Sequence, residues 1–501
     1  MENKGMTEVM LEASTQDKRE RAAIDRSVRY PVLFFFISAA GWLCLASLLG
    51  FVAAAKLMAP GMWGNCPWLS YGRLFPAHMD ALIYGWGMQA GFGVMIWLMA
   101  RLCRVEVKNA VTLIVAGNIW NVAVLVGVVA VWGGQGNSLA WLDFPAYLWP
   151  ALFLTYAVIS GSLMMMFRRR RKGDVYVSQR YIFGAALWFP WIYATANLLI
   201  HHTGGSALMD AGVNAWYMSG LVYLWFVPVG LASIYYLLPK IMGRQVYSYQ
   251  LAQLGFWALA ILAGWMGFNR FQGGPFPSWM PAISGAAVIL MLLPVLAVAV
   301  NCRGTIAGRF AVVMESPALS LTLLGGAMFI CHGLLSAAMS FFGVSRILQF
   351  TYATVGIDTM TLYGFFTLVM SGAIYFIVPR ICARKWPSDS LIGAHFWLLV
   401  FALIMVVGFT VFGGVAQGVV MDNWSRDLID SIRHSNGYVM GWVVGWALVL
   451  AASLVFCYQL GLMFLGGGRE AEGSALSQNN TGEGADAEAA GSLAKGEAAK
   501  A

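Results

Sequence analysis

Side chains that bind metals or move protons are few in this sequence, and they are scattered along it. Of its 501 residues, six are histidine and seven are cysteine. The histidines are His78, His201, His202, His332, His395 and His434. The cysteines are Cys44, Cys66, Cys103, Cys302, Cys331, Cys382 and Cys457. No Cys-x-x-Cys or Cys-x-x-Cys-His motif occurs, which excludes a zinc knuckle and covalent c-type haem attachment, and isolated cysteines are expected to be small apolar fillers.

Two charged positions stand out because of the apolar runs around them. Arg270 follows Asn269 at the end of one such run, in MGFNRFQGGPFPSW. Asp358 lies inside another run, in VGIDTMTLYGF. A charged side chain at membrane depth is costly, so it normally has a polar partner or a function. The elements that hold these residues therefore have to be identified first.

The composition is that of a membrane protein. Apolar residues make up 59% of the chain and charged residues only 11%, whereas soluble domains are about 45–50% apolar. The net charge of +8 comes from basic residues between the apolar runs. Membrane topology explains this charge, and nucleic acid is not an expected partner. Residues 1–29 have no apolar core, so no signal peptide is expected.

Twelve apolar runs approach or exceed the length of about 20 residues that a helix needs to cross a bilayer. They are residues 31–57, 76–100, 110–133, 145–167, 181–200, 214–239, 250–268, 281–301, 312–341, 350–379, 391–416 and 435–466. We therefore expect an all-α integral membrane protein with a twelve-helix domain over residues 30–466. Residues 1–29 are expected to be a cytoplasmic segment, and residues 467–501, rich in Gly, Ala, Ser and Glu, a disordered cytoplasmic tail.

Basic residues gather in alternate loops, and this pattern predicts the orientation. The densest cluster is RRRRKGD, residues 168–174, and Arg101, Arg104 and residues 380–385 belong to the same set of loops. The intervening loops carry only isolated arginines, such as Arg73. Because positive charge stays on the cytoplasmic side, both termini are expected in the cytoplasm.

Three segments of the sequence resemble a known family. They contain PAHMDALIY, AWYMSGLV and VGIDTMTLYGF, and the second continues through IYYLLPK, VYSYQL and FWAL to GGPFPSW. Together they resemble subunit I of the haem–copper oxidases, nearest the cbb-type cytochrome c oxidases, over about residues 70–380. The expected twelve-helix bundle agrees with this family.

The resemblance implies a catalytic subunit that holds two haems and one copper inside the bundle. Such subunits reduce oxygen to water and couple the reaction to proton movement. The resemblance also implies other membrane subunits of a respiratory complex as partners, among them membrane-anchored cytochrome c subunits. The expected location is the inner membrane of a bacterium.

The family's six histidine ligands can be carried over to this sequence position by position. In chain order, the corresponding residues are His78, Ser219, Asn269, Arg270, Ile357 and Thr359. The first corresponds to the ligand of the low-spin haem, the next three to the copper ligands, and the last two to the haem ligands of the tenth helix. Only the first is still a histidine, so five ligand positions are vacated.

The substituted side chains do not suit metals. Arginine stays protonated and offers only donors, and isoleucine offers iron nothing. We expect no copper and no high-spin haem, and so no site for oxygen. The alternative is a site built from displaced residues: His201 and His202 lie at the outer end of the fifth helix, and His332 takes the place of a family glutamate.

The vacated centre predicts a specific contact. Arg270 stands at a former copper ligand and Asp358 lies between two former haem ligands. We predict that they form an ion pair, or a hydrogen-bonded cluster with Asn269, Ser219 and Thr359, that fills the site. The alternative is that Arg270 extends to the outer surface and Asp358 bonds to backbone.

His78 has two interpretations. A lone buried histidine is more often a hydrogen-bonded core residue than a ligand. If it does bind a b-type haem, Met360 is a weak candidate for the second ligand, because methionine is an established axial partner. However, one residue of shift from Thr359 turns Met360 about 100° around the helix. At most one haem is therefore expected, at His78.

These expectations favour a degenerate subunit I that is a non-catalytic or altered member of a respiratory electron-transfer complex. Two alternatives stay open from the sequence. One is a working cbb-type cytochrome c oxidase with unorthodox ligands. The other is a membrane protein that conducts protons or a small solute through the emptied bundle.

Overall fold

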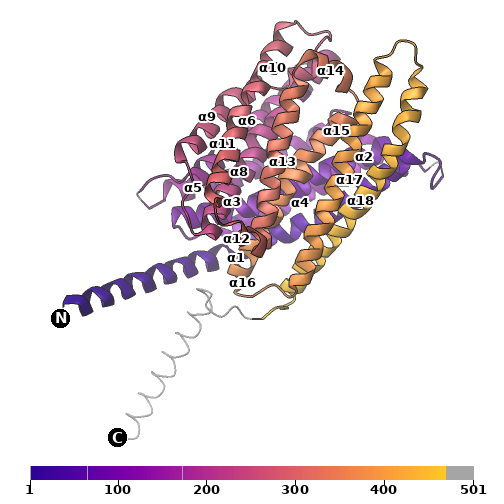
Figure 1. Cartoon of the computed structure of the whole chain (residues 1–501). Helices are drawn as coiled ribbons and strands as arrows, with labels where there is room; N and C mark the ends of the chain where they lie inside the picture. Colours follow the sequence, from indigo (N-terminus) through magenta and orange to yellow (C-terminus); the bar gives the residue numbers. More distant parts are fainter. Residues whose placement is uncertain (1, 65, 172, 470–501) are drawn as a thin grey trace.

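The apolar runs become helices, because a backbone surrounded by lipid has to satisfy its hydrogen bonds internally. A computed structural model describes residues 2–64, 66–171 and 173–469, and within them every regular element is helical. The helices stand side by side as a bundle, with α17 and α18 forming a long hairpin along one side (Figure 1). The expected all-α fold is confirmed.

The main helices have the following bounds. They are α1 (Glu2–Met58), α2 (Tyr71–Asp80), α3 (Met88–Cys103), α4 (Ala110–Ala130), α5 (Trp149–Arg168), α6 (Val177–His202), α7 (Ala207–Leu221), α8 (Val227–Met242), α9 (Tyr249–Leu262), α10 (Trp279–Leu290), α11 (Leu292–Ile306), α12 (Phe310–Glu315), α13 (Pro317–Met339), α14 (Phe342–Leu348), α15 (Tyr352–Thr359), α16 (Leu368–Cys382), α17 (Asp389–Met421) and α18 (Leu428–Phe464). Three π-helical segments, Ala81–Gly87, Val222–Phe226 and Met360–Thr367, join α2 to α3, α7 to α8 and α15 to α16.

Three spans form the interior of the bundle. They are Tyr71–Cys103, Ala207–Met242 and Tyr352–Cys382, and their most apolar windows are 100, 94 and 100% buried, against 39–61% for the other eight long spans of the described chain. Each of the three contains one of these π-helical segments, and a fourth, Val131–Gln135, ends the outer span that begins with α4. Such segments are rare in helices and are frequent at functional sites. The same three spans carry the sequence segments on which the family resemblance rests.

Small residues let these central helices approach closely. Gly230 on α8 lies directly against the ring of Phe365, in the π-helical segment that precedes α16, and a side chain at Gly230 would collide with that ring. Helices in a membrane associate through such close contacts, since lipid gives them little hydrophobic drive toward one another. The two segments are therefore tightly packed at this point.

Eleven helical spans of the described chain are long and apolar enough to cross a membrane, so the predicted count of twelve is not confirmed. The predicted run that does not form a long span is 250–268. There α9 has only 14 residues and continues into a 3-10 turn at Ala263–Trp265. Gly267 then turns the chain with a φ of 112°. As a result, Asn269 and Arg270 lie on a second 3-10 turn, Phe268–Phe271, and not at the end of a continuous helix.

Both ends of the described chain lie at the face that carries the basic loops. Near the N-terminus, Asp17 and Glu20 of α1 form ion pairs with Arg104, at 3.3 and 3.5 Å. Near the other end, the backbone N–H of Lys385 donates to the carbonyl of Arg469 at 2.9 Å. The first residues of the predicted 467–501 tail thus contact the basic loop, and residues 470–501 lie outside the described part.

Candidate functional site

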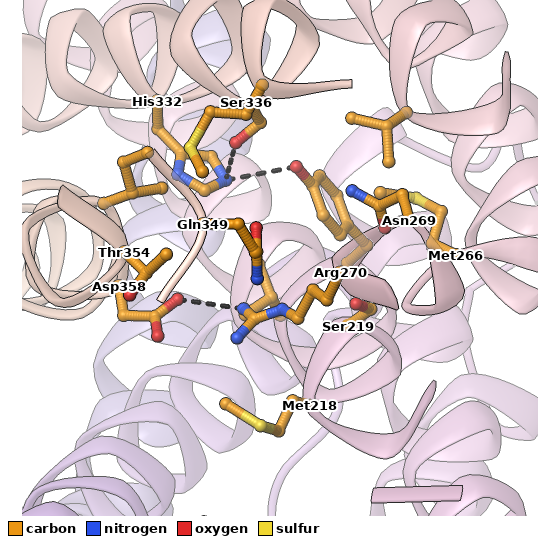
Figure 2. A pocket seen from close by; sticks show the side chains of 15 residues that line it. Met218, Ser219, Met266, Asn269, Arg270, His332, Ser336, Gln349, Thr354 and Asp358 are labelled. Carbon is orange, nitrogen blue, oxygen red and sulfur yellow. Dashed lines mark hydrogen bonds and ion pairs between the residues drawn. The ribbon is translucent and has the colours of Figure 1, made fainter. Parts of the chain in front are cut away.

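Four of the five positions that the resemblance assigns to missing ligands line one cavity. Ser219 comes from α7, Asn269 and Arg270 from the 3-10 turn after α9, and Ile357 from α15. The cavity has a volume of about 80 Å³ (Figure 2). Three segments far apart in the sequence therefore meet at the place where the family resemblance puts the oxygen-reducing centre. The fifth position, Thr359, is not in the lining, and its hydroxyl donates to the Val355 carbonyl at 2.8 Å.

An ion pair crosses this cavity. Nη2 of Arg270 lies 3.1 Å from Oδ1 of Asp358, and both side chains are part-buried, with 31% and 20% exposed. Figure 2 shows the guanidinium of Arg270 extending across the cavity toward Asp358, with Gln349 beside it. The arginine thus has an acidic partner at the cavity.

The wider polar cluster differs from the expected one. The Asn269 side chain accepts a hydrogen bond from Ser284 of α10 at 3.2 Å, and Thr359 bonds to its own helix. Polar groups absent from the expected cluster, among them Gln349 and Thr354, complete the lining. Gln349 precedes α15 on a short link, and nothing in its sequence context indicates that it faces the arginine.

A buried chain of side chains borders the cavity on the α13 side. The Thr361 hydroxyl lies 3.1 Å from the Ile357 carbonyl and 2.7 Å from Nδ1 of His332. The Tyr223 hydroxyl lies 3.1 Å from Nε2 of the same histidine. His332 is therefore engaged on both ring nitrogens and is a hydrogen-bonded core residue.

These residues do not fit a copper ion. The three positions that the resemblance assigns to copper ligands carry a hydroxyl, an amide and a guanidinium, and a guanidinium repels a cation and donates no lone pair. Among the described residues, no group of three or more His, Cys, Asp and Glu side chains lies close enough together to hold a metal ion. The expected alternative of displaced ligands gains no support, because His201 and His202 lie at the far end of α6 and do not line the cavity.

His78 is enclosed by aromatic rings. Its Nδ1 lies 2.7 Å from the Ala46 carbonyl, a contact also typical of histidine ligands. The Trp446 ring stands edge-on at 4.7 Å, and the Tyr363 ring lies parallel at 6.3 Å. All three side chains are at most 2% exposed. Because the rings of Trp446 and Tyr363 lie against His78, its surroundings are those of a packed interior and do not match an open haem pocket.

Met360 offers no second ligand in this arrangement. It is buried, 5% exposed, at the start of the π-helical segment Met360–Thr367. On the same segment it is Tyr363 whose ring faces His78. The surroundings of His78 therefore match those of a packed core histidine.

The comparison with known families agrees with the fold and with the position of the cavity. Residues 30–460 match the family described as Cytochrome C and Quinol oxidase polypeptide I. The chain belongs to this family, the haem–copper oxidase subunit I proteins, as the sequence segments had indicated.

Its relatives are distant but cover most of its length. The Cbb3-type cytochrome c oxidase subunit CcoN1 of Stutzerimonas stutzeri is 25% identical over 441 residues, which is 85% of this chain and 92% of the relative. The cytochrome c oxidase subunit 1 homolog (bacteroid) of Bradyrhizobium diazoefficiens is 23% identical over 86% of this chain and 81% of its own. A cryo-EM structure of a heme-copper terminal oxidase dimer matches with a TM-score of 0.75 at 15% identity, over 89% of this chain and 85% of the other. The subunit I fold is thereby confirmed.

Proposed function

We propose that this chain is a non-catalytic subunit I homologue that serves as a structural member of a respiratory membrane complex. The observation that carries the proposal is the Arg270–Asp358 ion pair, which lies across the cavity lined by four vacated ligand positions. In this family the corresponding space holds the metals that bind oxygen. Here a cation and its counter-ion occupy it.

The chemistry supports the loss of oxygen reduction. A haem–copper centre supplies the electrons and the coordination sites that split oxygen, and the protein contributes its ligands and their orientation. Without imidazole at Ser219, Asn269, Arg270 and Ile357, this chain has nothing with which to hold copper or the high-spin haem. The bundle can still fold, because its close helix contacts are made by glycine and apolar side chains.

The proposed membrane location, orientation and partners follow from the family and from the charged loops. The chain is a multi-pass protein with bacterial relatives named as cytochrome c oxidase subunits. We place it in the inner membrane with both termini in the cytoplasm, because the basic loops lie at the face that holds both ends of the described chain. Other respiratory subunits, including membrane-anchored cytochrome c proteins, are the partners that this placement favours.

Oxygen uptake by the intact complex tests the proposal. The full chain is expressed with the subunits that purify with it, and uptake is measured with reduced cytochrome c as electron donor. We expect no uptake above that of membranes lacking the chain. Turnover that disappears when Arg270 is replaced by methionine would show a working oxidase with unorthodox ligands and would overturn the proposal.

A variant in which histidine is introduced at the three copper positions tests the assignment of the cavity more directly. Ser219→His, Asn269→His and Arg270→His are combined in one chain, with Ser219→Ala, Asn269→Ala and Arg270→Ala as the matched control. Because the three positions line one cavity, only the histidine variant is expected to gain about one copper per chain. Equal copper in the histidine variant, the alanine control and the unaltered chain would contradict the assignment of this cavity as the former copper site.

A further inference from the structure

Two of the scattered cysteines meet in the folded chain. Cys44 on α1 and Cys457 on α18 are separated by 413 positions, yet their Sγ atoms lie 2.9 Å apart. Both lie within membrane-spanning helices, the first and the last of the bundle. This contact was not expected from the sequence, where each cysteine stands alone among apolar residues.

Neighbouring contacts fix the register in which these two helices meet. One turn away, the hydroxyls of Ser47 and Ser453 lie 2.8 Å apart. The Cys457 thiol donates to the Ala40 carbonyl at 3.0 Å, and the Cys44 thiol to the Ser453 carbonyl at 3.5 Å. The thiols are thus held in place by short contacts between two antiparallel helices, and they do not meet at a mobile end.

We infer that Cys44 and Cys457 form a disulfide that joins the first and the last membrane helix. A disulfide has a sulfur–sulfur distance of about 2.05 Å, so the two Sγ atoms need to approach by less than about 1 Å. The inference is independent of the proposed function, because neither cysteine lies at the cavity or at a ligand position.

The bond requires an electron acceptor, and a quinone of the membrane is the chemical class that fits the location. Two thiols lose two protons and two electrons as the sulfur–sulfur bond forms, and the quinone gains both and becomes a quinol. The thiols are only part-buried. Beside them, Leu48, Leu454 and Tyr458 are 46, 55 and 59% exposed at the apolar surface of the bundle. A lipid-soluble oxidant can therefore reach the pair from the bilayer.

The bond would fasten the hairpin of α17 and α18 to the rest of the bundle. α18 packs on α1 and on α17, and the disulfide would close a loop of more than 400 residues. A cross-link over so long a loop restricts the unfolded chain strongly. The oxidised form is therefore expected to resist thermal unfolding more than the reduced form.

Thiol counting on the full chain tests the inference. Membranes are treated with decylubiquinone, the protein is denatured in N-ethylmaleimide, and the labelled cysteines are counted by intact mass. We expect two fewer labels than the seven cysteines allow, full labelling after dithiothreitol, and a Cys44–Cys457 linked peptide after digestion. Seven labels after both decylubiquinone and diamide would overturn the disulfide, and a bond with diamide alone would overturn the quinone as acceptor.

Variants separate this bond from other oxidation. Cys44→Ser and Cys457→Ser should each abolish the linked peptide and the rise in melting temperature on oxidation. Cys331→Ser, at an exposed cysteine of α13, is the matched control and should keep both. A rise in melting temperature that persists in Cys44→Ser would overturn the inference. The thiol count is made on the unaltered chain, so its result does not depend on whether a variant folds.

Discussion

An arginine held inside a membrane bundle depends on its counter-ion more than an exposed arginine does. Arg270 and Asp358 are part-buried and share one contact of 3.1 Å, with the polar cavity around them. Removing one partner leaves the other charge without compensation, whereas removing both leaves only a polar cavity. Comparing the single variants with the double variant therefore measures the interaction between Arg270 and Asp358.

Charge-neutralising variants test the coupling. Arg270→Gln and Asp358→Asn are each expected to lower the free energy of unfolding by about 1–3 kcal/mol, toward the lower end because both groups still face polar space. The double variant should lose less than the sum of the single losses. Thermal melting in detergent measures all three, and strictly additive losses would contradict a functional ion pair.

A second residue-scale prediction concerns Asp143, on the loop between α4 and α5. Its side chain is buried, with the residue 3% exposed. Burial raises the pKa of this carboxyl from 3.8 to about 7, a backbone hydrogen bond from Trp141 opposes the shift, and the buried carboxyl of Asp80 lies close enough to interact with its charge. Between about pH 4 and about pH 7 the folded chain therefore holds a proton that the unfolded chain has lost.

Stability should consequently fall as the pH rises through that window. Asp143→Asn keeps the shape of the side chain but cannot ionise, so its melting temperature should change less with pH. Melting curves from pH 4 to pH 8 on both proteins make the comparison. If the melting temperatures of the two proteins change with pH in the same way, the burial of Asp143 does not contribute to the pH dependence of stability.

At the scale of elements, the early end of α9 decides where Asn269 and Arg270 lie. The turn at Gly267 has a φ of 112°, and a Cβ there would lie 2.5 Å from the Ala215 carbonyl oxygen. Gly267 therefore combines a backbone conformation that suits glycine with a close approach to α7. A longer α9 would carry Arg270 away from α15.

A pair of alanine substitutions tests this turn. Gly267→Ala should lower the free energy of unfolding by more than about 2 kcal/mol, because both the backbone and the packing oppose it. Gly264→Ala, where the nearest atom to a new Cβ is 3.9 Å away, should change it little. Similar melting temperatures for the two variants would contradict the role of Gly267.

The sequence could predict the spans because hydropathy is a local property, and it could select positions that line one cavity because family motifs keep their register. It could not predict that the run at 250–268 is interrupted, since this depends on the contact between Gly267 and α7. Nor could it predict that Gln349 lines the cavity, because the link before α15 has no periodic pattern. Cys44 and Cys457 come together only when α1 packs on α18.

At the scale of the whole molecule, the basic loops predict which face is cytoplasmic. Cys66 is exposed on the connection between α1 and α2, at the end of α1 opposite the ion pairs of Asp17 and Glu20. In spheroplasts, a membrane-impermeant maleimide is therefore expected to label Cys66 from outside. Cys66→Ser should remove that label. Labelling of Cys66 only after the membrane is opened would reverse the orientation.

If the Arg270–Asp358 pair has replaced a metal centre, the unaltered chain holds neither copper nor haem, and its metal content is the decisive measurement. Iron and copper are measured per chain on purified protein, together with the absorption spectrum of the reduced form. We expect no stoichiometric copper and no haem band assigned to this chain. Two haems and one copper per chain would contradict it, and one haem lost in His78→Ala would contradict the packed-core assignment of His78.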